Sequence, residues 1–511
     1  MKLRSLLDGL MVKGVEGLED QVIEGIYYNS RHVTPGGLFV AVPGFQADGH
    51  AFIDDAVQRG ASAIVTERPW GGPSSVSVVE VENARRALAA LSTAFYGEPS
   101  RELFVIGITG TNGKTTTAYL VESILRVAGF NVGVVGTINY RFGGETFLNS
   151  VTTPESLDLM RILRQMVNRG VTHAVLEVSS HALDLDRVAF CDFDVGAFTN
   201  LSRDHLDYHG DMELYWQCKR KLFLEYLGAG SKQVQAAAVV NWDDDKGKEL
   251  ASEVGVRCLR VGLSEGCQIR AEHRHVTIGG GSAKVKTPKG DFDYTSSLIG
   301  RHNVYNVLAA TGVALAMGLP LATIKKGIEG LQGVPGRLEP VANEAGIHVF
   351  VDYAHTPDAL ENVLTALKEL TAGRLIAIFG CGGDRDRDKR PMMGVSAGRL
   401  CDLCVVTSDN PRTEAPEAIL QEILAGMVTV KSHRYDPMAL AKGFNGPGYV
   451  VEQDRRRAIA LGLGAARRGD TVLIAGKGHE TYQITAEGTL PFDDRVEARK
   501  ILSKRSLATD A

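Results

Sequence analysis

Several features that would narrow the class of this protein are scarce or missing from its sequence. Only seven of the 511 residues are cysteine, an odd number scattered along the chain, which argues against a disulfide framework. No apolar run approaches the roughly 18 residues of a membrane-spanning helix. The net charge of −5 argues against a general nucleic-acid-binding protein. We therefore expect a cytoplasmic globular protein with no nucleic-acid or membrane partner.

Two local patterns resemble a signal peptide and a metal or redox site, but each lacks a feature that such a segment or site needs. The basic residues Lys2 and Arg4 resemble the start of a signal peptide, but charged residues from Asp8 onward interrupt any apolar core. Cys401 and Cys404 have the spacing of a metal or redox pair. No second cysteine pair or nearby histidine accompanies them, and an apolar strand continues after them. Buried strand cysteines are therefore the better interpretation.

A glycine-rich stretch over residues 107–117 is the most informative part of the sequence. It follows an apolar run typical of a buried parallel strand and precedes a segment with helical spacing of apolar residues. In such a loop, backbone N–H groups converge on phosphate oxygens, and Lys114 and Thr115 suit the β/γ-phosphates and Mg²⁺. The usual spacing is not kept, because Ile108 stands where a glycine is expected. A plain glycine turn is the alternative, but it does not explain a lysine followed by three threonines.

Polar residues also follow the next two predicted strands, in a central segment that alternates strands and helices. Glu177 lies near the end of a strand predicted over residues 174–178, and the strand over residues 195–200 leads to Asp204 and His205. Ligands bind beyond the carboxyl ends of parallel strands, and a carboxylate there is a natural Mg²⁺ ligand. A solvated loop with a helix cap is the alternative for the second cluster.

Other polar residues are ambiguous from the pattern alone. Residues 29–31 either bind a polar ligand or cap a turn, and Asn303 either contacts a base edge or caps an alanine-rich helix. Lys219 reads as an ordinary helix lysine. Residues 255–295 are rich in glycine and β-branched side chains, which predicts short antiparallel strands.

Four predicted strands near the C-terminus each end in a polar or glycine-rich stretch. The strands are expected over residues 348–351, 375–379, 403–408 and 471–475, and the stretches after them cover residues 352–357, 380–385, 409–412 and 476–480. Because the carboxyl ends of parallel strands meet at one edge of a sheet, these stretches should converge on one rim. Residues 384–390 alternate in charge, a pattern typical of a mobile surface loop.

Together these motifs resemble the Mur ligases, ATP-dependent amide-forming enzymes of peptidoglycan synthesis and hence of cell shape and division. The matching stretches occur in family order over nearly the whole chain, at residues 109–117, 177–181, 200–210, 302–306, 336–337, 352–357 and 380–385. The resemblance implies an α/β protein of three domains: a small N-terminal α/β domain for the UDP end of the substrate, a central P-loop-type ATPase with a mostly parallel sheet, and a C-terminal Rossmann-like domain for the incoming amino acid. We place them at residues 1–98, 99–335 and 336–511.

By matching position, the resemblance implies roles for individual residues. Catalysis would involve Lys114, Glu177, His205 and Lys219, and Lys219 falls where the family carries a carbamylated lysine. Mg²⁺ would be held by Thr115, Glu177 and His205. The ATP contacts would be Gly110, Thr111, Asn112, Gly113, Lys114, Thr115, Thr116, Asn303, Arg337, Asp352 and His355. The UDP-sugar dipeptide would be held by Ser30, Thr152, Thr153, Ser179 and Arg187. Leu185 departs from the family, which often has a polar side chain there.

Within the family, residues 201–210, 409–412 and 476–480 resemble the member that adds the third residue of the peptide. Its substrates are ATP, UDP-N-acetylmuramoyl-L-alanyl-D-glutamate and meso-diaminopimelate, which it joins through an acyl phosphate. The diaminopimelate contacts implied by position are Arg385, Asp409, Asn410, Pro411, Arg412, Gly476 and Glu480. Arg412 can hold the distal carboxylate of diaminopimelate through a bidentate charge-assisted pair. L-Lysine lacks that carboxylate and would leave the arginine unpaired.

Three alternatives to this interpretation remain open from the sequence. The nearest is the same reaction with L-lysine as the added amino acid. A folylpolyglutamate-synthetase-like ligase would share the ATPase core, but the N-terminal domain and the motif over residues 409–412 argue against it. A nucleotide-regulated binding protein without turnover is disfavoured by the intact set Lys114, Glu177, His205 and Lys219. We expect a monomer.

Overall fold

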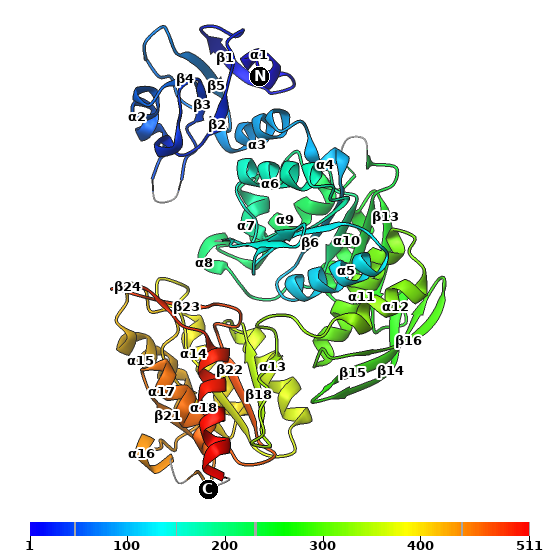
Figure 1. The fold of residues 1–511 in the computed structure, drawn as a ribbon, viewed down its shortest axis with the longest axis vertical. Helices are drawn as coiled ribbons and strands as arrows, with labels where there is room; N and C mark the ends of the chain where they lie inside the picture. Colours follow the sequence, from blue (N-terminus) through cyan, green and yellow to red (C-terminus); the bar gives the residue numbers. More distant parts are fainter. Residues whose placement is uncertain (45–46, 150, 229–231, 441–442, 510–511) are drawn as a thin grey trace.

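The computed structural model of the protein describes residues 1–44, 47–149, 151–228, 232–440 and 443–509. Three large β-sheets, each covered by helices, follow one another along the chain from the N-terminus to the C-terminus (Figure 1). The expected α/β architecture is therefore confirmed. No helix in these ranges is long and apolar enough to cross a membrane.

The N-terminal sheet has the strand order β1-β5-β4-β3-β2, in which only β1 runs antiparallel to its neighbour. Its strands are β1 (Val12–Glu16), β2 (Gly25–Tyr27), β3 (Gly37–Val40), β4 (Ala61–Thr66) and β5 (Ser77–Val81). Its helices are α1 (Leu3–Leu7), η1 (Ser30–His32), η2 (Gly49–Phe52), α2 (Ile53–Gln58) and α3 (Ala84–Phe95). Asn83 starts α3, because its side chain accepts a hydrogen bond from the Arg86 amide at 2.9 Å.

The central sheet has the order β16-β15-β14-β13-β12-β11-β6-β10-β7-β8-β9. Its strands are β6 (Phe104–Thr109), β7 (Val132–Val135), β8 (Tyr140–Phe142), β9 (Glu145–Phe147), β10 (His173–Glu177), β11 (Val195–Phe198), β12 (Ala237–Asn241), β13 (Arg257–Gly262), β14 (Ile269–Thr277), β15 (Gly280–Thr287) and β16 (Gly290–Ser296). The strands from β7 to β14 in this order pair in parallel, and both ends are antiparallel. The antiparallel prediction for residues 255–295 is correct for β14 to β16 but wrong for β13, which continues the parallel sheet beside β12.

Helices cover both faces of the central sheet. They are α4 (Pro99–Glu102), α5 (Lys114–Val127), α6 (Ser156–Asn168), α7 (Ser180–Asp184), α8 (Leu206–His209), α9 (Met212–Lys221), the π-helical turn η3 (Leu222–Tyr226), α10 (Asp245–Glu253), α11 (Arg301–Ala316) and α12 (Leu321–Gly330). One core packs α5, α11 and α12 on one face of the sheet, and a second core packs α6, α7, α9 and α10 on the other. The apolar strand β6 lies between the two cores, which explains its uninterrupted apolar sequence.

The C-terminal sheet has the order β17-β18-β22-β19-β20-β21 and is parallel apart from β17. Its strands are β17 (Glu339–Pro340), β18 (His348–Asp352), β19 (Leu375–Phe379), β20 (Leu403–Val406), β21 (Gly448–Val451) and β22 (Thr471–Ala475), and a separate hairpin joins β23 (Tyr482–Thr485) to β24 (Gly488–Pro491). Its helices are α13 (Pro357–Leu370), α14 (Lys389–Leu400), α15 (Pro416–Met427), α16 (Pro437–Leu440), α17 (Arg455–Ala465) and α18 (Asp494–Thr509). The four strands predicted here are neighbours in this sheet, so their carboxyl ends meet at one rim as expected.

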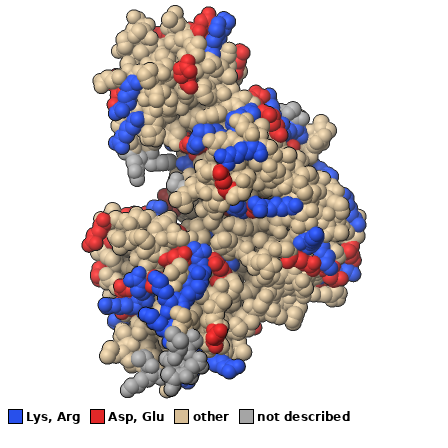
Figure 2. Space-filling view, viewed as in Figure 1, with Lys and Arg blue, Asp and Glu red and all other residues tan. Residues whose placement is uncertain are grey.

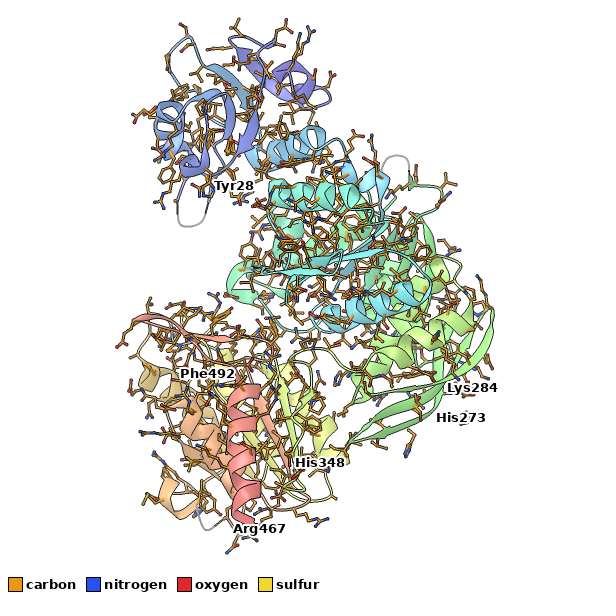
Figure 3. All side chains as sticks on the ribbon, viewed as in Figure 1. Tyr28, His273, Lys284, His348, Arg467 and Phe492 are labelled. Carbon is orange, nitrogen blue, oxygen red and sulfur yellow. The ribbon has the colours of Figure 1, made fainter. Side chains whose placement is uncertain are left out.

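Polar contacts cross the junctions between the three sheets. Tyr28, at the edge of the N-terminal sheet, donates a hydrogen bond to the Asp158 carboxylate of α6 at 2.7 Å (Figure 3). The Arg203 amide of the central segment donates to the Asp358 carboxylate of α13 at 3.2 Å. Charged side chains of both signs are interspersed on the visible face of the molecule, as expected from its small net charge (Figure 2).

Candidate active site

The glycine-rich loop lies between β6 and α5, as the sequence predicts. Gly110 and Gly113 have φ angles of 144° and 88°, in the left-handed region that favours glycine. A Cβ atom on Gly110 would overlap the Thr199 hydroxyl, and one on Gly113 would overlap the Asn306 side chain. Both the backbone conformation and the lack of space therefore require glycine at these two positions.

Two lysine side chains from different elements converge on this loop. Lys114 Nζ donates hydrogen bonds to the carbonyl oxygens of Gly110 at 2.8 Å and Thr111 at 2.9 Å. Lys219 Nζ, from α9, donates to the same Gly110 oxygen at 2.9 Å. Two cationic groups thus share one neutral acceptor, an arrangement that favours the binding of an anion between them.

Lys219 is buried, with only 1% of its surface exposed, contrary to its appearance as an ordinary helix lysine. Among the described residues, no carboxylate lies within salt-bridge distance of its Nζ, although the amine lies 4.3 Å from the centre of the Tyr215 ring. Burial, followed by the neighbouring Lys114 charge, lowers the pKa of Lys219 well below its ordinary value. The lowered pKa favours the neutral form of the Lys219 amine, which is the nucleophilic form.

Glu177 is fixed at the end of β10 by two threonines. Its Oε2 accepts hydrogen bonds from the Thr115 hydroxyl at 2.8 Å and the Thr137 hydroxyl at 2.9 Å, and its Oε1 accepts one from the Thr137 amide at 3.1 Å. A Cβ on Gly136 would overlap the carboxylate. Arg337 Nη2 donates to the Thr115 hydroxyl at 3.3 Å from the far side of the site. A buried carboxylate beside a hydroxyl is the hard-oxygen donor set that Mg²⁺ prefers, so these residues fit the cation.

The polar cluster after β11 is split between two environments. Asp204 and His205 line the same cavity as the glycine loop, and His205 Nε2 lies 3.4 Å from Asp204 Oδ2. His209 turns away, with its Nε2 2.9 Å from the Ser180 hydroxyl oxygen. Burial lowers the pKa of His205 to about 3, so its imidazole is neutral and keeps a lone pair for a ligand. Among the described residues, no three His, Cys, Asp or Glu side chains form a ready-made metal cluster.

A cavity of about 630 Å³ collects residues from the central and the C-terminal parts of the chain. Those of its lining residues that the sequence singled out are Thr111, Asn112, Gly113, Lys114, Thr115, Thr116, Thr152, Ser179, His205, Asn303, Arg337, Asp352 and His355. The Asn303 side chain donates to the Ile299 carbonyl at 2.7 Å, and Gly300 is the helix cap. Asp352 accepts hydrogen bonds from the amides of Leu338 at 2.6 Å and Ala354 at 2.7 Å, and burial raises its pKa.

The positions expected to hold the UDP-sugar dipeptide are only partly brought together. The Thr153 hydroxyl donates to the Glu177 carbonyl at 2.8 Å and accepts from the Ser179 amide at 3.1 Å. Arg187 Nη1 donates to the Thr153 carbonyl at 3.2 Å. Ser30 is buried in the N-terminal part, in the turn η1 next to the N-terminal sheet. Leu185, the apolar departure, is half-buried at the end of α7.

The C-terminal rim carries two cationic side chains, Arg385 and Arg412, that hydrogen-bond to backbone carbonyl oxygens. Arg412 Nη1 donates to the Gly383 carbonyl at 2.8 Å, and Arg385 Nη1 donates to the Asp384 carbonyl at 2.9 Å. Neither guanidinium forms an ion pair within the described part of the chain. Burial, followed by the Arg385 charge, lowers the pKa of Arg412. The two groups form a site of positive charge suited to a carboxylate.

The other expected rim residues pack around Asn410. Its Nδ2 donates to Glu480 Oε2 at 2.9 Å, and its Oδ1 accepts from Lys477 Nζ, also at 2.9 Å. Lys477 is fully buried and also donates to Glu480 Oε2 at 3.1 Å, so it already balances the carboxylate expected to take the distal ammonium. Gly476 leaves room for the Asp409 carboxylate, whose Oδ2 is buried without a hydrogen-bond donor. The Pro411 carbonyl lies where a Cβ on Gly383 would be.

Sequence reasoning missed several residues that the structure places in or beside the site. Thr137 contacts Glu177 through both its hydroxyl and its amide, and Lys477 contacts Glu480. His302, whose pKa burial lowers to about 4, and Tyr353 line the cavity. His302 and Tyr353 lie within the family-matching stretches 302–306 and 352–357, but no role was predicted for either side chain. Thr137 lies two residues after the end of β7, and no sequence pattern marked it as a site residue.

Comparison with known proteins agrees with this arrangement. Three family models match successive parts of the chain: Mur ligase family, catalytic domain, at residues 22–96; Mur ligase middle domain, at residues 108–314; and Mur ligase, glutamate ligase domain, at residues 336–478. A UDP-N-acetylmuramoyl-L-alanyl-D-glutamate–2,6-diaminopimelate ligase of Geobacter metallireducens is 50% identical over 93% of each chain. A protein of the same name from Geobacter sulfurreducens is 46% identical over 98% of each chain.

A solved structure of a protein with that name shares the fold over 99% of both chains. Its TM-score is 0.69 and its sequence identity is 30%. The similarity therefore covers the N-terminal, central and C-terminal sheets alike, in sequence and in three dimensions. The chain belongs to the Mur ligase family.

Proposed function

We propose that the protein joins meso-diaminopimelate to the D-glutamate of UDP-N-acetylmuramoyl-L-alanyl-D-glutamate at the expense of ATP, in cytoplasmic peptidoglycan synthesis. The full-length relatives are named for 2,6-diaminopimelate, which does not support the L-lysine alternative. Their match includes the N-terminal sheet, which disfavours the folylpolyglutamate-synthetase-like alternative. The observation that carries the choice of amino acid is that the guanidinium groups of Arg385 and Arg412 form no ion pair among the described residues. Diaminopimelate brings a second carboxylate that could pair with them, and lysine does not.

The chemistry follows from the weakness of a carboxylate as an electrophile. A D-glutamate carboxylate oxygen attacks the γ-phosphorus of ATP, the bond from that phosphorus to the β–γ bridging oxygen breaks, and ADP leaves. The amine of diaminopimelate then attacks the acyl carbon, inorganic phosphate leaves, and the amine proton passes to solvent. Lys114 and the loop amides stabilise the charge on the transferring phosphoryl group. Mg²⁺ held by Thr115, Glu177 and His205 would neutralise phosphate charge when bound.

Lys219 is proposed to carry a carbamate, as N6-carboxylysine. Its neutral amine attacks the carbon of CO₂, a new N–C bond forms, and the displaced N–H proton goes to solvent, which leaves an anion in place of a cation. The support for this modification is the burial of Lys219, its lowered pKa and the sharing of the Gly110 carbonyl with Lys114. An anion at this position would offset the positive charge of Lys114 and favour a bound metal ion.

The remaining assignments are proposals of the same kind. We propose domain limits at residues 1–98, 99–335 and 336–511, which bind the UDP end, ATP and the amino acid respectively. Ser30, Thr152, Thr153, Ser179 and Arg187 are proposed to hold the UDP-sugar dipeptide. Glu480, Asn410, Asp409, Pro411 and Gly476 are proposed to shape the diaminopimelate site around the two arginines. We propose that the protein works as a monomer.

The test is phosphate release with ATP, Mg²⁺ and UDP-N-acetylmuramoyl-L-alanyl-D-glutamate, comparing meso-diaminopimelate, L-lysine and no amino acid. Release only with diaminopimelate is expected. Equal release with lysine would keep the ligase reaction and overturn the choice of amino acid. A Lys114→Ala variant serves as the blank, because it removes the amine that faces the phosphates while leaving the C-terminal rim intact.

A further inference from the structure

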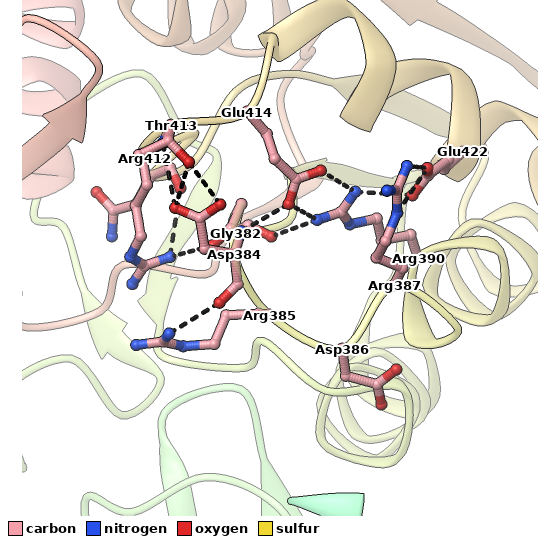
Figure 4. A network of polar contacts seen from close by, with 12 residues as sticks. Gly382, Asp384, Arg385, Asp386, Arg387, Arg390, Arg412, Thr413, Glu414 and Glu422 are labelled. Atoms are coloured by element: carbon pink, nitrogen blue, oxygen red, sulfur yellow. Dashed lines mark hydrogen bonds and ion pairs between the residues drawn. The ribbon is translucent and has the colours of Figure 1, made fainter. Parts of the chain in front are cut away.

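The charge-alternating run over residues 384–390 is not a solvated loop throughout, contrary to its sequence pattern. It ends in Arg390, on the first turn of α14, whose side chain is fully buried. The guanidinium forms a bidentate pair with Glu414, Nη2 to Oε1 at 2.7 Å and Nη1 to Oε2 at 2.9 Å (Figure 4). It also pairs with Glu422 of α15 at 2.7 Å and donates to the Gly382 carbonyl at 3.1 Å.

Glu414 connects this buried cation to the loop after β19. Its Oε1 also accepts a hydrogen bond from the Asp384 amide at 2.6 Å. The hydrogen bond from Arg390 is the largest of the causes that lower the pKa of Glu414 to about 2, so the carboxylate is ionised at any working pH. The pair therefore fixes the backbone at Gly382 and Asp384, on both sides of Gly383.

The loop after β19 is in turn joined to the loop after β20, which carries Arg412. The Gly383 amide donates to the Asn410 carbonyl at 2.9 Å, and the Thr413 hydroxyl donates to the Asp384 carboxylate at 2.8 Å. Asp384 and Arg412 have φ angles of 52° and 54°, a left-handed conformation that L-residues adopt rarely. Such conformations persist only where the surroundings fix them, and here the contacts that fix them lead back to Arg390 and Glu414.

We propose that the pair between the buried Arg390 and the partly exposed Glu414 is a positioning element that selects the incoming amino acid. It holds the two loops in register, so that Arg385 and Arg412 present their guanidinium groups at a fixed separation to the distal carboxylate. Neither Arg390 nor Glu414 is placed to touch the substrate. The inference rests on the proposed function, because the distal carboxylate is what the two arginines would recognise.

The test compares two isosteric changes at carboxylates that both pair with Arg390. Glu414→Gln removes the negative charge and one of the two oxygens that pair with Arg390, because an amide nitrogen replaces one carboxylate oxygen. Glu422→Gln perturbs the same arginine and also Arg387 of the loop after β19, but it leaves the hydrogen bond from the Asp384 amide to Glu414 in place, so it controls for lost stability. We expect Glu414→Gln to raise the KM for meso-diaminopimelate at least about tenfold and to lower its selectivity over L-lysine, with the KM for ATP unchanged. Glu422→Gln should change the selectivity by less than about twofold.

A second variant keeps the proposal testable if Glu414→Gln does not fold. Thr413→Val removes the exposed hydroxyl bond to Asp384 and should shift KM and selectivity in the same direction by a smaller factor. If the selectivity of Glu414→Gln for diaminopimelate over lysine is unchanged, the positioning role is refuted and the proposed function is not. If Glu414→Gln does not fold, unchanged selectivity in Thr413→Val has the same meaning. Equal effects of Glu414→Gln and Glu422→Gln on KM and selectivity would show that the pair has only a structural role, which would also refute the positioning role. A wild-type protein that does not use diaminopimelate would instead overturn the proposed function and this inference together.

Discussion

At the scale of single residues, the shared Gly110 carbonyl makes Lys219 the most sensitive position in the central site. Replacement by arginine keeps a positive charge but prevents carbamylation, so the site lacks the anion that the proposed carbamate would supply. We expect Lys219→Arg to lose at least about 10²-fold in kcat, the size of effect seen when one electrostatic contact to a transition state is removed. Steady-state phosphate release measures this loss.

The matched control for Lys219→Arg is Lys221→Arg, two residues further along α9 and partly exposed. It should leave turnover unchanged. Depletion of dissolved CO₂ from the wild-type protein should reduce its activity, and added bicarbonate should restore it. Turnover that is indifferent to bicarbonate, together with an active Lys219→Arg variant, would refute the carbamate.

Arg412 offers a second test at this scale, because its charge has no anionic partner among the described residues. Arg412→Ala should raise the KM for meso-diaminopimelate by about 10- to 100-fold, since a hydrogen bond to a charged group contributes about 1.5–3 kcal/mol. ATP binding, measured by calorimetry, should not change. Arg434→Ala, at an exposed arginine that forms an isolated bridge with Tyr449 of β21, is the control. An unaltered KM for diaminopimelate would rule out the contact.

At the scale of elements, the start of β10 carries a titratable group that couples stability to pH. His173 lies against the Phe130 ring, with ring centres 3.9 Å apart, and burial lowers its pKa to about 4. The unfolded histidine has a pKa of about 6.5, so the unfolded chain binds the proton first as the pH falls. The resulting loss of stability begins near pH 6.5 and reaches up to about 3 kcal/mol near pH 4.

The expected outcome for His173→Phe is a shallower fall in the free energy of unfolding between pH 6.5 and pH 4. Urea titrations at several pH values give this slope directly. The exposed His348 at the start of β18 provides the matched substitution, His348→Phe, which should leave the slope as in the wild type. Identical slopes in all three proteins would show that protonation of His173 does not contribute.

Elements also show how far the sequence alone could lead. The strand β6, the glycine loop and the polar ends of β18, β19, β20 and β22 were predictable, because apolar runs and turn residues are local signals. The pairing of β13 was not, since parallel or antiparallel partners are chosen by tertiary contacts. The burial of Lys219 and Arg390 could not be predicted either, because each depends on groups far away in sequence, such as Gly110 and Glu414.

At the scale of the whole molecule, contacts between the central and the C-terminal parts surround the cavity. Arg337 reaches the Thr115 hydroxyl, and the Arg203 amide reaches Asp358. We expect a non-hydrolysable ATP analogue with the UDP-linked substrate to make the molecule more compact, because the ligands fill a cavity lined from both sides. Small-angle scattering should show a smaller radius of gyration. The same mixture with Lys114→Ala should show no change, and a wild-type protein of constant size would contradict closure.

The contact between Arg337 and the Thr115 hydroxyl has a consequence for how ligands influence one another. Any ligand that alters this contact changes the free-energy difference between arrangements of the central and the C-terminal sheets. Thermodynamic reciprocity then requires that the factor by which nucleotide tightens amino-acid binding is also the factor by which the amino acid tightens nucleotide binding. Where the coupling is positive, an amino-acid mimic binds the nucleotide-loaded protein more tightly than the empty one, so searches for such inhibitors should compare the two states.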